Sequence, residues 1–211
     1  MTLLAAFKVL LYRYTGTGDI VVGSPIANRD RSEIEGLIGF FVNTLVLRTN
    51  LSDNPTFREL LRRVREVTLG AYEHQDLPFD LLVEELKPQR DLSHTPLFQV
   101  MFVLQNASIS AVELSGLTLQ ALQSETSTAK FDLTLLMEET ESGLNGALQY
   151  NTDLFDPATI ARMAEHLQTL LAGIVVNPDQ PVAQLPLLTA QEQHQLLTWN
   201  HTHAEYSLNK C

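Results

Sequence analysis

Apolar residues recur along the chain with two periods, one typical of helices and one typical of strands. Helical spacing predicts a helix before Gly16, another from Phe57 to about Tyr72, and a long helix that begins at Pro157. Runs rich in aromatic and β-branched residues predict strands at Ile20–Val22, Phe40–Leu47, Leu97–Leu104, Leu117–Leu122, Phe131–Glu138 and Leu144–Tyr150. Helices and strands alternate at first, and strands then cluster before a closing helix. This order predicts an α/β (α+β two-layer) fold, a mixed β-sheet packed with helices.

The predicted strand Phe40–Leu47 carries apolar side chains on both faces, which is typical of a strand covered on both sides. Asn43 is the exception, because it shares a face with Phe41 and Leu45. A buried amide without hydrogen-bond partners costs roughly 1–3 kcal/mol. Two interpretations follow: Asn43 ties down a neighbouring backbone segment, or it faces an internal channel and contacts a substrate amide.

Capping and turn residues predict where the elements begin and end. Thr56 with Glu59, and Thr189 with Glu192, each fit a capping box. Ser142-Gly143 indicates a hairpin between the last two strands. We expect a domain over 1–180 and a linker over 181–211, whose tail after Trp199 is polar and predicted to be disordered.

The composition excludes several classes of function. A net charge of −11 argues against nucleic acid, and the densest basic cluster is typical of a solvated helix face: Arg58, Arg62, Arg63 and Arg65. No apolar run reaches the roughly 18 residues that a membrane span requires. The single cysteine, Cys211, allows no internal disulfide, and zinc-ligand spacing is absent, so we expect no metal and a cytoplasmic setting.

Candidate catalytic groups are few. His74 and Asp76 suggest a general base oriented by a carboxylate, but residues two apart on a helix do not face each other. A histidine at a helix end is more often a C-terminal cap. Ser24 lacks the glycine-flanked pattern of a nucleophile. Taken alone, these residues do not identify an enzyme.

Four blocks resemble, in order and separation, the later motifs of condensation domains from nonribosomal peptide synthetases. The blocks are Val22-Gly23-Ser24-Pro25-Ile26-Ala27-Asn28-Arg29, Ile38-Gly39-Phe40-Phe41-Val42-Asn43-Thr44-Leu45 with Arg48, His74-Gln75-Asp76-Leu77-Pro78-Phe79, and Arg90-Asp91-Leu92-Ser93 with Pro96-Leu97-Phe98-Gln99. The resemblance covers roughly residues 1–180. The segment from Leu187 to Asn200 is similar to the linker that leads into an adenylation domain.

The chain departs from the family at one decisive point. Condensation domains pair two subdomains that resemble chloramphenicol acetyltransferase, and their signature of two histidines followed by Asp-Gly belongs to the N-terminal one. No stretch matches it here, since His201 and His203 are separated by Thr202 in the tail. The resemblance therefore implies the C-terminal half of an amide-forming condensation domain, without catalytic residues of its own and inactive in isolation.

The resemblance also implies the reaction and its components. An amine on a downstream aminoacyl thioester attacks an upstream aminoacyl or peptidyl thioester, and an amide bond forms. No cofactor is expected to bind directly, because phosphopantetheine-tethered substrates arrive on carrier proteins. The expected partners are the N-terminal condensation subdomain, upstream and downstream carrier proteins, and an adenylation domain in cis.

Residue roles carry over motif by motif. The tunnel-wall candidates are Ser24, Asn28, Arg29, Phe41 and Asn43, and the motif residues with structural roles are His74, Asp76, Pro78, Arg90, Asp91 and Gln99. The segment 106–128 is expected to cross to the other subdomain. Two alternatives remain open: a non-catalytic interaction module, and an unrelated acyltransferase that uses His74.

Overall fold

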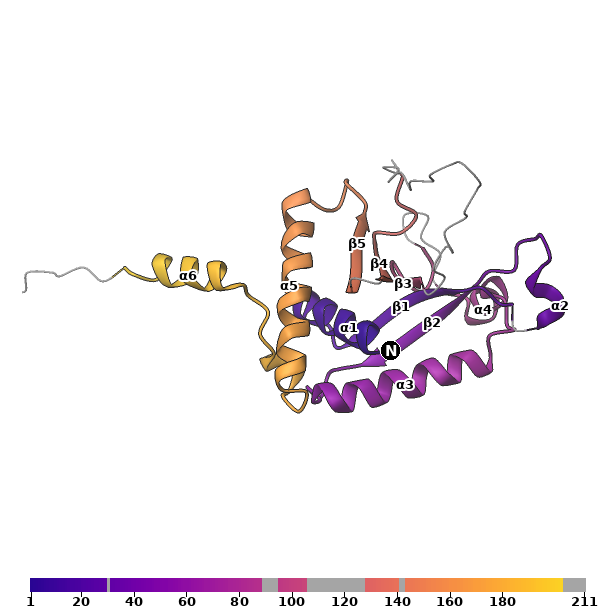
Figure 1. Cartoon of the computed structure of the whole chain (residues 1–211), viewed down its shortest axis with the longest axis horizontal. Helices are drawn as coiled ribbons and strands as arrows, with labels where there is room; N and C mark the ends of the chain where they lie inside the picture. Colours follow the sequence, from indigo (N-terminus) through magenta and orange to yellow (C-terminus); the bar gives the residue numbers. More distant parts are fainter. Residues whose placement is uncertain (30, 89–94, 106–127, 141–142, 203–211) are drawn as a thin grey trace, which may run out of the picture.

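The computed structural model describes residues 1–29, 31–88, 95–105, 128–140 and 143–202 (Figure 1). The helices are α1 (Thr2–Thr15), α2 (Ser32–Glu35), α3 (Phe57–Glu73), α4 (Phe79–Leu86), α5 (Pro157–Val176), the 3-10 helix η1 (Val182–Gln184) and α6 (Ala190–Trp199). The strands are β1 (Asp19–Ile26), β2 (Asn43–Asn50), β3 (Val100–Gln105), β4 (Leu133–Thr140) and β5 (Gly143–Tyr150). The predicted strand Leu117–Leu122 lies outside the described residues.

The strands form one sheet in the order β2-β1-β3-β4-β5. The pairs β1–β2 and β4–β5 are antiparallel, while β1–β3 and β3–β4 are parallel. The two parallel pairs require long crossover connections, whereas β4 and β5 are consecutive and pair from Thr140 opposite Gly143 onward. The predicted mixed sheet and the pairing expected at Gly143 are confirmed.

Helices α1, α3 and α5 bury one face of this sheet. Strand residues of alternate parity point toward them, as Ile20 and Val22 do from β1 and Leu133 and Leu135 do from β4. The helices meet them with side chains that are almost fully buried: Phe7 and Leu10 from α1, Leu60 and Val64 from α3, and Leu170 and Ile174 from α5. One core between one helical layer and one sheet makes the two-layer arrangement that the sequence predicts.

Strand β2 begins three residues later than the sequence predicts. The pairing of β2 with β1 begins at Asn43, which lies opposite Ile26. It begins there because β1 ends at Ile26, where the polar loop starts. Phe40, expected inside the strand, is 90% exposed. Within the strand, Leu45 and Leu47 are buried on one face while Thr44 and Val46 are half-buried on the other, so the described residues cover the second face only in part.

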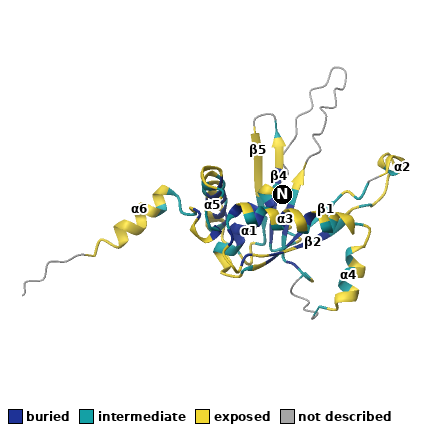
Figure 2. Ribbon diagram, turned by 90° about the horizontal axis from the view of Figure 1, so that it is seen from below, coloured by how far each residue is buried: buried dark blue, intermediate teal, exposed yellow. Residues whose placement is uncertain are grey.

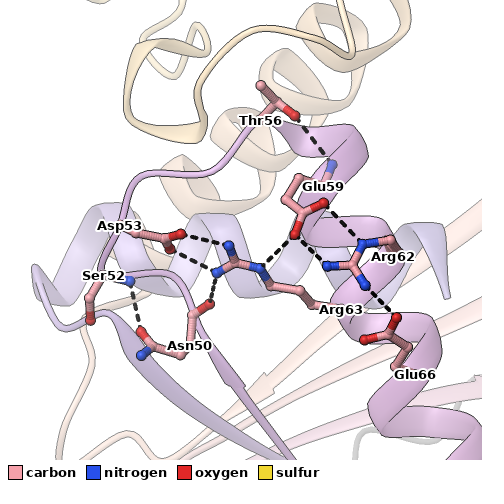
Figure 3. Close-up of polar contacts among 8 residues, drawn as sticks. All are labelled: Asn50, Ser52, Asp53, Thr56, Glu59, Arg62, Arg63 and Glu66. Atoms are coloured by element: carbon pink, nitrogen blue, oxygen red, sulfur yellow. Dashed lines mark hydrogen bonds and ion pairs between the residues drawn. The ribbon is translucent and has the colours of Figure 1, made fainter.

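Helix α3 begins with half of the predicted capping box (Figure 3). The Thr56 hydroxyl accepts the Glu59 N–H, as expected. The Glu59 carboxylate instead accepts hydrogen bonds from Arg62 and Arg63, one helical turn ahead, so it does not reach back. These two guanidinium groups hold the pKa of Glu59 at about 2.

Three of the four arginines in the basic cluster of α3 are paired with carboxylates, as a solvated face predicts. Arg63 also binds Asp53 at 2.6 Å and Arg62 also binds Glu66 (Figure 3). Arg58 binds the carboxylate of Asp179. Arginines whose charge is already matched are poorly placed to neutralise phosphates. That the chain does not bind nucleic acid stays a prediction.

The segment after α5 packs back onto the domain body before α6 departs from it. Val182 and Leu185 are buried, the Val182 N–H donates to the Pro55 carbonyl, and Arg13 donates to the Leu185 carbonyl at 2.8 Å. A Cβ on Gly173 would lie 2.4 Å from Pro186, so that approach requires glycine. The linker expected from residue 181 is therefore packed on the body as far as Leu185, and α6 then extends away (Figures 1 and 2).

None of the described helices is long and apolar enough to cross a bilayer.

Candidate functional site

The four sequence blocks meet at one place, where β1, β2, the start of α4 and the segment before β3 come together. We call this place the motif junction and define it by Gly23, Asn43, Phe79 and Phe98. Each of the four residues comes from a different block. Their convergence gives the widely spaced blocks a common physical basis.

Asn43 joins β2 to the connection between α3 and α4. Its side-chain nitrogen donates to the carbonyls of Gln75 and Leu77, both at 2.8 Å. Its side-chain oxygen accepts the N–H groups of Thr44 at 2.9 Å and Phe79 at 3.1 Å. An amide has two donor hydrogens and two acceptor lone pairs, so all four bonding positions are used.

This geometry favours the interpretation in which Asn43 ties down a neighbouring backbone segment. A direct contact between Asn43 and substrate stays a prediction. The partners at residues 75 and 77 lie more than thirty positions away in sequence, so no local pattern identifies them.

Aromatic rings fill the rest of the motif junction. Phe98 is 2% exposed, and its ring centroid lies 5.6 Å from that of Phe79 and 5.5 Å from that of Phe131. A Cβ on Gly23 would lie 2.2 Å from the Phe98 ring. The glycine of the first block thus makes room for the phenylalanine of the fourth.

Arg29 fixes the loop between α2 and β2. Its guanidinium donates to four backbone carbonyls, those of Ile34, Glu35, Leu37 and Gly39. The same group lies 4.3 Å from the centroid of the Phe41 ring, in cation–π geometry. Two predicted tunnel-wall residues therefore contact each other, and together they hold the loop in shape.

The loop that Arg29 holds carries a set of exposed apolar side chains, which we call the apolar ledge. Its members are Leu37, Ile38, Phe40 and Val42, which are 52%, 105%, 90% and 48% exposed. Single exposed apolar residues are ordinary, but a contiguous group on a loop held by hydrogen bonds is typical of an interaction surface. Figure 2 shows the α2 region as exposed, at the opposite end of the molecule from α6.

A cavity of about 360 Å³ lies on the sheet face opposite the helices. Pro25, Met101, Val103, Thr134 and Leu136 line it from three neighbouring strands, and Lys130, Phe131 and Gln149 complete it with Thr128. Phe131 belongs both to this cavity and to the aromatic cluster. The cavity and the motif junction therefore share a wall.

The other tunnel-wall candidates lie close to the junction. Ser24 is half-buried in β1 opposite Leu45, so its side chain is on the helix-covered face rather than in the cavity. Asn28 follows β1 with a φ of 50°, a left-handed conformation that asparagine tolerates well. Their contact with substrate is untested by the structure and stays a prediction.

The third block holds the end of α3 and the start of α4. His74 is the C-cap of α3, and its exposed ring donates from Nδ1 to the Gly70 carbonyl at 2.9 Å. Pro78 is the N-cap of α4, and Asp76 is exposed between the two helices. The expected capping role of His74 is therefore present in the structure.

In the fourth block, Gln99 donates to the Thr95 carbonyl at 3.0 Å, one residue from the buried Phe98. Arg90 and Asp91 lie outside the described residues. Within the residues that the structure describes, no three histidine, cysteine or carboxylate side chains gather as a metal site.

Sequence reasoning missed the cavity, although one signal was available. Strand β3 is apolar on both faces, so Met101 and Val103 have to face something other than the helices. It also missed that Arg29 and Phe41 act as a pair, because cation–π contacts leave no fixed spacing. The described contacts of the junction are hydrogen bonds of one amide and packing of aromatic rings, and the Arg29 guanidinium holds the neighbouring loop.

Fold and site together define a two-layer α/β module with an open sheet face, whose motif residues shape a surface. A family model for the condensation domain matches residues 1–197, and the chain belongs to that family. The chain is similar to one of the linear gramicidin synthase proteins of Brevibacillus parabrevis, with 56% identity over 214 residues that cover 100% of this chain and 3% of that protein. It is also similar to malpinin synthetase of Mortierella alpina, with 47% identity over 212 residues covering 100% of this chain and 3% of that protein.

Solved structures agree. A four-domain nonribosomal peptide synthetase bound to AMP and glycine matches with a TM-score of 0.82 and 26% identity, over 91% of this chain and 16% of that one. The X-domain from teicoplanin biosynthesis matches with a TM-score of 0.80 and 31% identity, over 89% of this chain and 43% of that one. The chain thus spans 3% of the two curated relatives and less than half of the X-domain.

Proposed function

We propose that this chain is the C-terminal half of a nonribosomal peptide synthetase condensation domain, where it contributes one wall of the site of amide bond formation. The observation that carries the proposal is the convergence of all four blocks on the motif junction beside an open cavity. In this proposal an upstream aminoacyl or peptidyl thioester and a downstream aminoacyl thioester meet between the two halves, and the enzyme's work is their alignment.

Three observations support the assignment to one half. The chain matches only 43% of the X-domain chain, whose fold it shares. The apolar ledge is exposed, and a cavity lies on the sheet face that the described helices do not cover. The family's two-histidine signature has no counterpart in the sequence. The catalytic histidine would then come from the N-terminal half, and the isolated chain would be inactive.

The junction residues take defined roles in this proposal. Arg29 and Phe41 shape the ledge that meets the other half, and Asn43 keeps the α3–α4 connection against the wall. Ser24 and Asn28 remain candidates for contact with substrate. The apolar lining of the cavity suits the thin alkyl and amide arm of phosphopantetheine, or an amino acid side chain attached to it.

The proposal extends to partners and setting. Upstream and downstream carrier proteins would present the phosphopantetheine-tethered substrates, and no cofactor would bind to the chain directly. An adenylation domain in cis would follow α6, and the complete synthetase would work in the cytoplasm.

The test is a condensation assay with two loaded carrier proteins, one upstream and one downstream. We expect no dipeptide from this chain alone and dipeptide formation when the same chain is joined to an N-terminal condensation half. Failure of the joined protein to form dipeptide, while folded and with both carriers loaded, would contradict the proposal and favour a non-catalytic interaction module.

The alternative acyltransferase has its own control. His74→Ala in the joined protein is expected to leave turnover within about twofold, because the His74 ring caps a helix by bonding to a backbone carbonyl. Turnover by the isolated chain that disappears in His74→Ala would instead establish the unrelated acyltransferase.

A further inference from the structure

Three helices meet in a polar contact far from the motif junction. The imidazole of His166 in α5 lies between the Tyr14 hydroxyl of α1, 2.8 Å from Nδ1, and the Glu192 carboxylate of α6, 2.9 Å from Nε2. His166 is 6% exposed, whereas its partner Tyr14 is 39% exposed, so the contact lies at the edge of the domain body. The three residues are separated by up to 178 positions in sequence.

The donors and acceptors of this contact match one tautomer. A proton on Nε2 donates to the Glu192 carboxylate, which leaves Nδ1 to accept the Tyr14 O–H. Glu192 accepts in addition the Thr189 N–H at 2.8 Å and its hydroxyl at 2.9 Å, as part of the capping box that begins α6. One carboxylate therefore both starts the helix and attaches it to the body.

Helix α6 is attached to the domain body through its first turn. Glu192 is half-buried, while every other residue of α6 is exposed, including Leu197 and Trp199 at 70% and 64%. In Figure 1 the helix projects away from α5 and the rest of the domain. The preceding segment is buried as far as Leu185 and Leu187 still packs against the core, so the direction of α6 depends on what holds its first turn.

We propose that Tyr14, His166 and Glu192 form a clamp that fixes the direction in which α6 leaves the domain body. When the clamp is intact, α6 and anything joined to its end move with the body. When it is broken, α6 becomes a helix on a hinge at Leu188 and retains its own capping box. The clamp is independent of the wall proposed for the motif junction.

Trp199 reports on the clamp directly, because it is the only tryptophan of the chain and the last residue of α6. Time-resolved fluorescence anisotropy separates rotation of the helix from tumbling of the whole molecule. In His166→Leu, which removes both hydrogen bonds, we expect the amplitude of nanosecond depolarisation to rise about twofold or more. Tyr14→Phe removes one hydrogen bond and is expected to give a smaller rise.

The matched control is Tyr12→Phe, which deletes a hydroxyl from the same helix outside the clamp and is expected to leave the anisotropy unchanged. His166→Phe also removes both hydrogen bonds and keeps a ring in the same place, so it serves as a second test if His166→Leu does not fold. The ring ¹⁵N shifts of His166 are expected to place the proton on Nε2 in the parent protein. Unchanged Trp199 depolarisation in folded His166→Leu, or in His166→Phe when the former is unfolded, would overturn the proposal.

Discussion

Lys8 gives a prediction about stability whose sign follows from its surroundings. The residue is 0% exposed in α1, where every residue from Leu4 to Leu11 is buried. Its Nζ donates to the Leu47 carbonyl and to the Thr49 hydroxyl, both at 2.7 Å. A neutral amine has two N–H donors, so these two acceptors satisfy it completely, whereas the charged form has a third donor and loses its hydration.

Burial lowers the pKa of Lys8 from 10.5 to about 7, although Asp19 acts weakly in the opposite direction. The unfolded chain keeps its lysine protonated up to about pH 10.5 and so binds more protons than the native state above pH 7. The contribution of Lys8 to the free energy of unfolding therefore increases as the pH rises from about 7 toward 10.5. Below pH 7 this contribution is absent. Between pH 7 and 9 the gain amounts to about 2 kcal/mol, at 1.36 kcal/mol per pH unit once native Lys8 is neutral.

The assay is urea unfolding at pH 7 and pH 9, followed by far-ultraviolet circular dichroism in the parent chain and in Lys8→Met. We expect the parent to gain about 2 kcal/mol more than the variant over this range, because methionine has nothing to titrate. Lys130→Met is the control, since Lys130 is exposed and should behave as the parent does. An equal pH response in the parent and in Lys8→Met would refute the reasoning.

Three further predictions concern the motif junction and its loop. Gly23→Ala should lower the free energy of unfolding by about 1–3 kcal/mol in urea titrations, because its Cβ would meet the Phe98 ring at 2.2 Å; unchanged stability would show that Phe98 moves aside freely. Asn43→Ala should cost about 1–3 kcal/mol or more in the same titrations, because it leaves two carbonyls and two backbone N–H groups without their partner; an unchanged midpoint with lost condensation in the joined protein would instead favour direct substrate contact. Arg29→Ala should speed limited proteolysis within 34–39 by about tenfold while the global midpoint shifts little, since the bonds it removes lie in one exposed loop; equal cleavage rates would contradict the role of Arg29.

Much of the fold follows from local patterns. Four strands lie where alternation or apolar runs place them, to within a few residues at each end, and the capping residues Thr56 and Thr189 begin α3 and α6. These features depend on neighbours within about four positions, where spacing determines which side chains meet. The start of β2 was misplaced because Phe40 has strand propensity, but its pairing depends on where β1 ends.

The site is less predictable, because its bonds join distant positions. Sequence singled out Asn43 as an amide on an apolar strand, yet its partners at 75, 77 and 79 could not be derived from spacing. Glu59 shows the opposite case. The four residues from Thr56 to Glu59 predict that the Glu59 carboxylate caps the helix. Arg62 and Arg63, which compete for that carboxylate, lie within the same short stretch of sequence. Competition among several suitable partners is decided by three-dimensional geometry and not by motif.

The buried polar groups of this chain share one feature that bears on its function. Asn43 bonds to the α3–α4 connection, Arg29 to its own loop, Lys8 to β2, and His166 to α1 and α6. In each case the polar group joins segments that apolar packing alone leaves free to slide. Such groups give a surface one fixed shape, which is the property that the proposed tunnel wall would require when the reacting groups are delivered on flexible arms. The same principle accounts for the polar and glycine positions among the apolar residues of the blocks, because Asn43 and Gly23 determine how the segments of the motif junction meet.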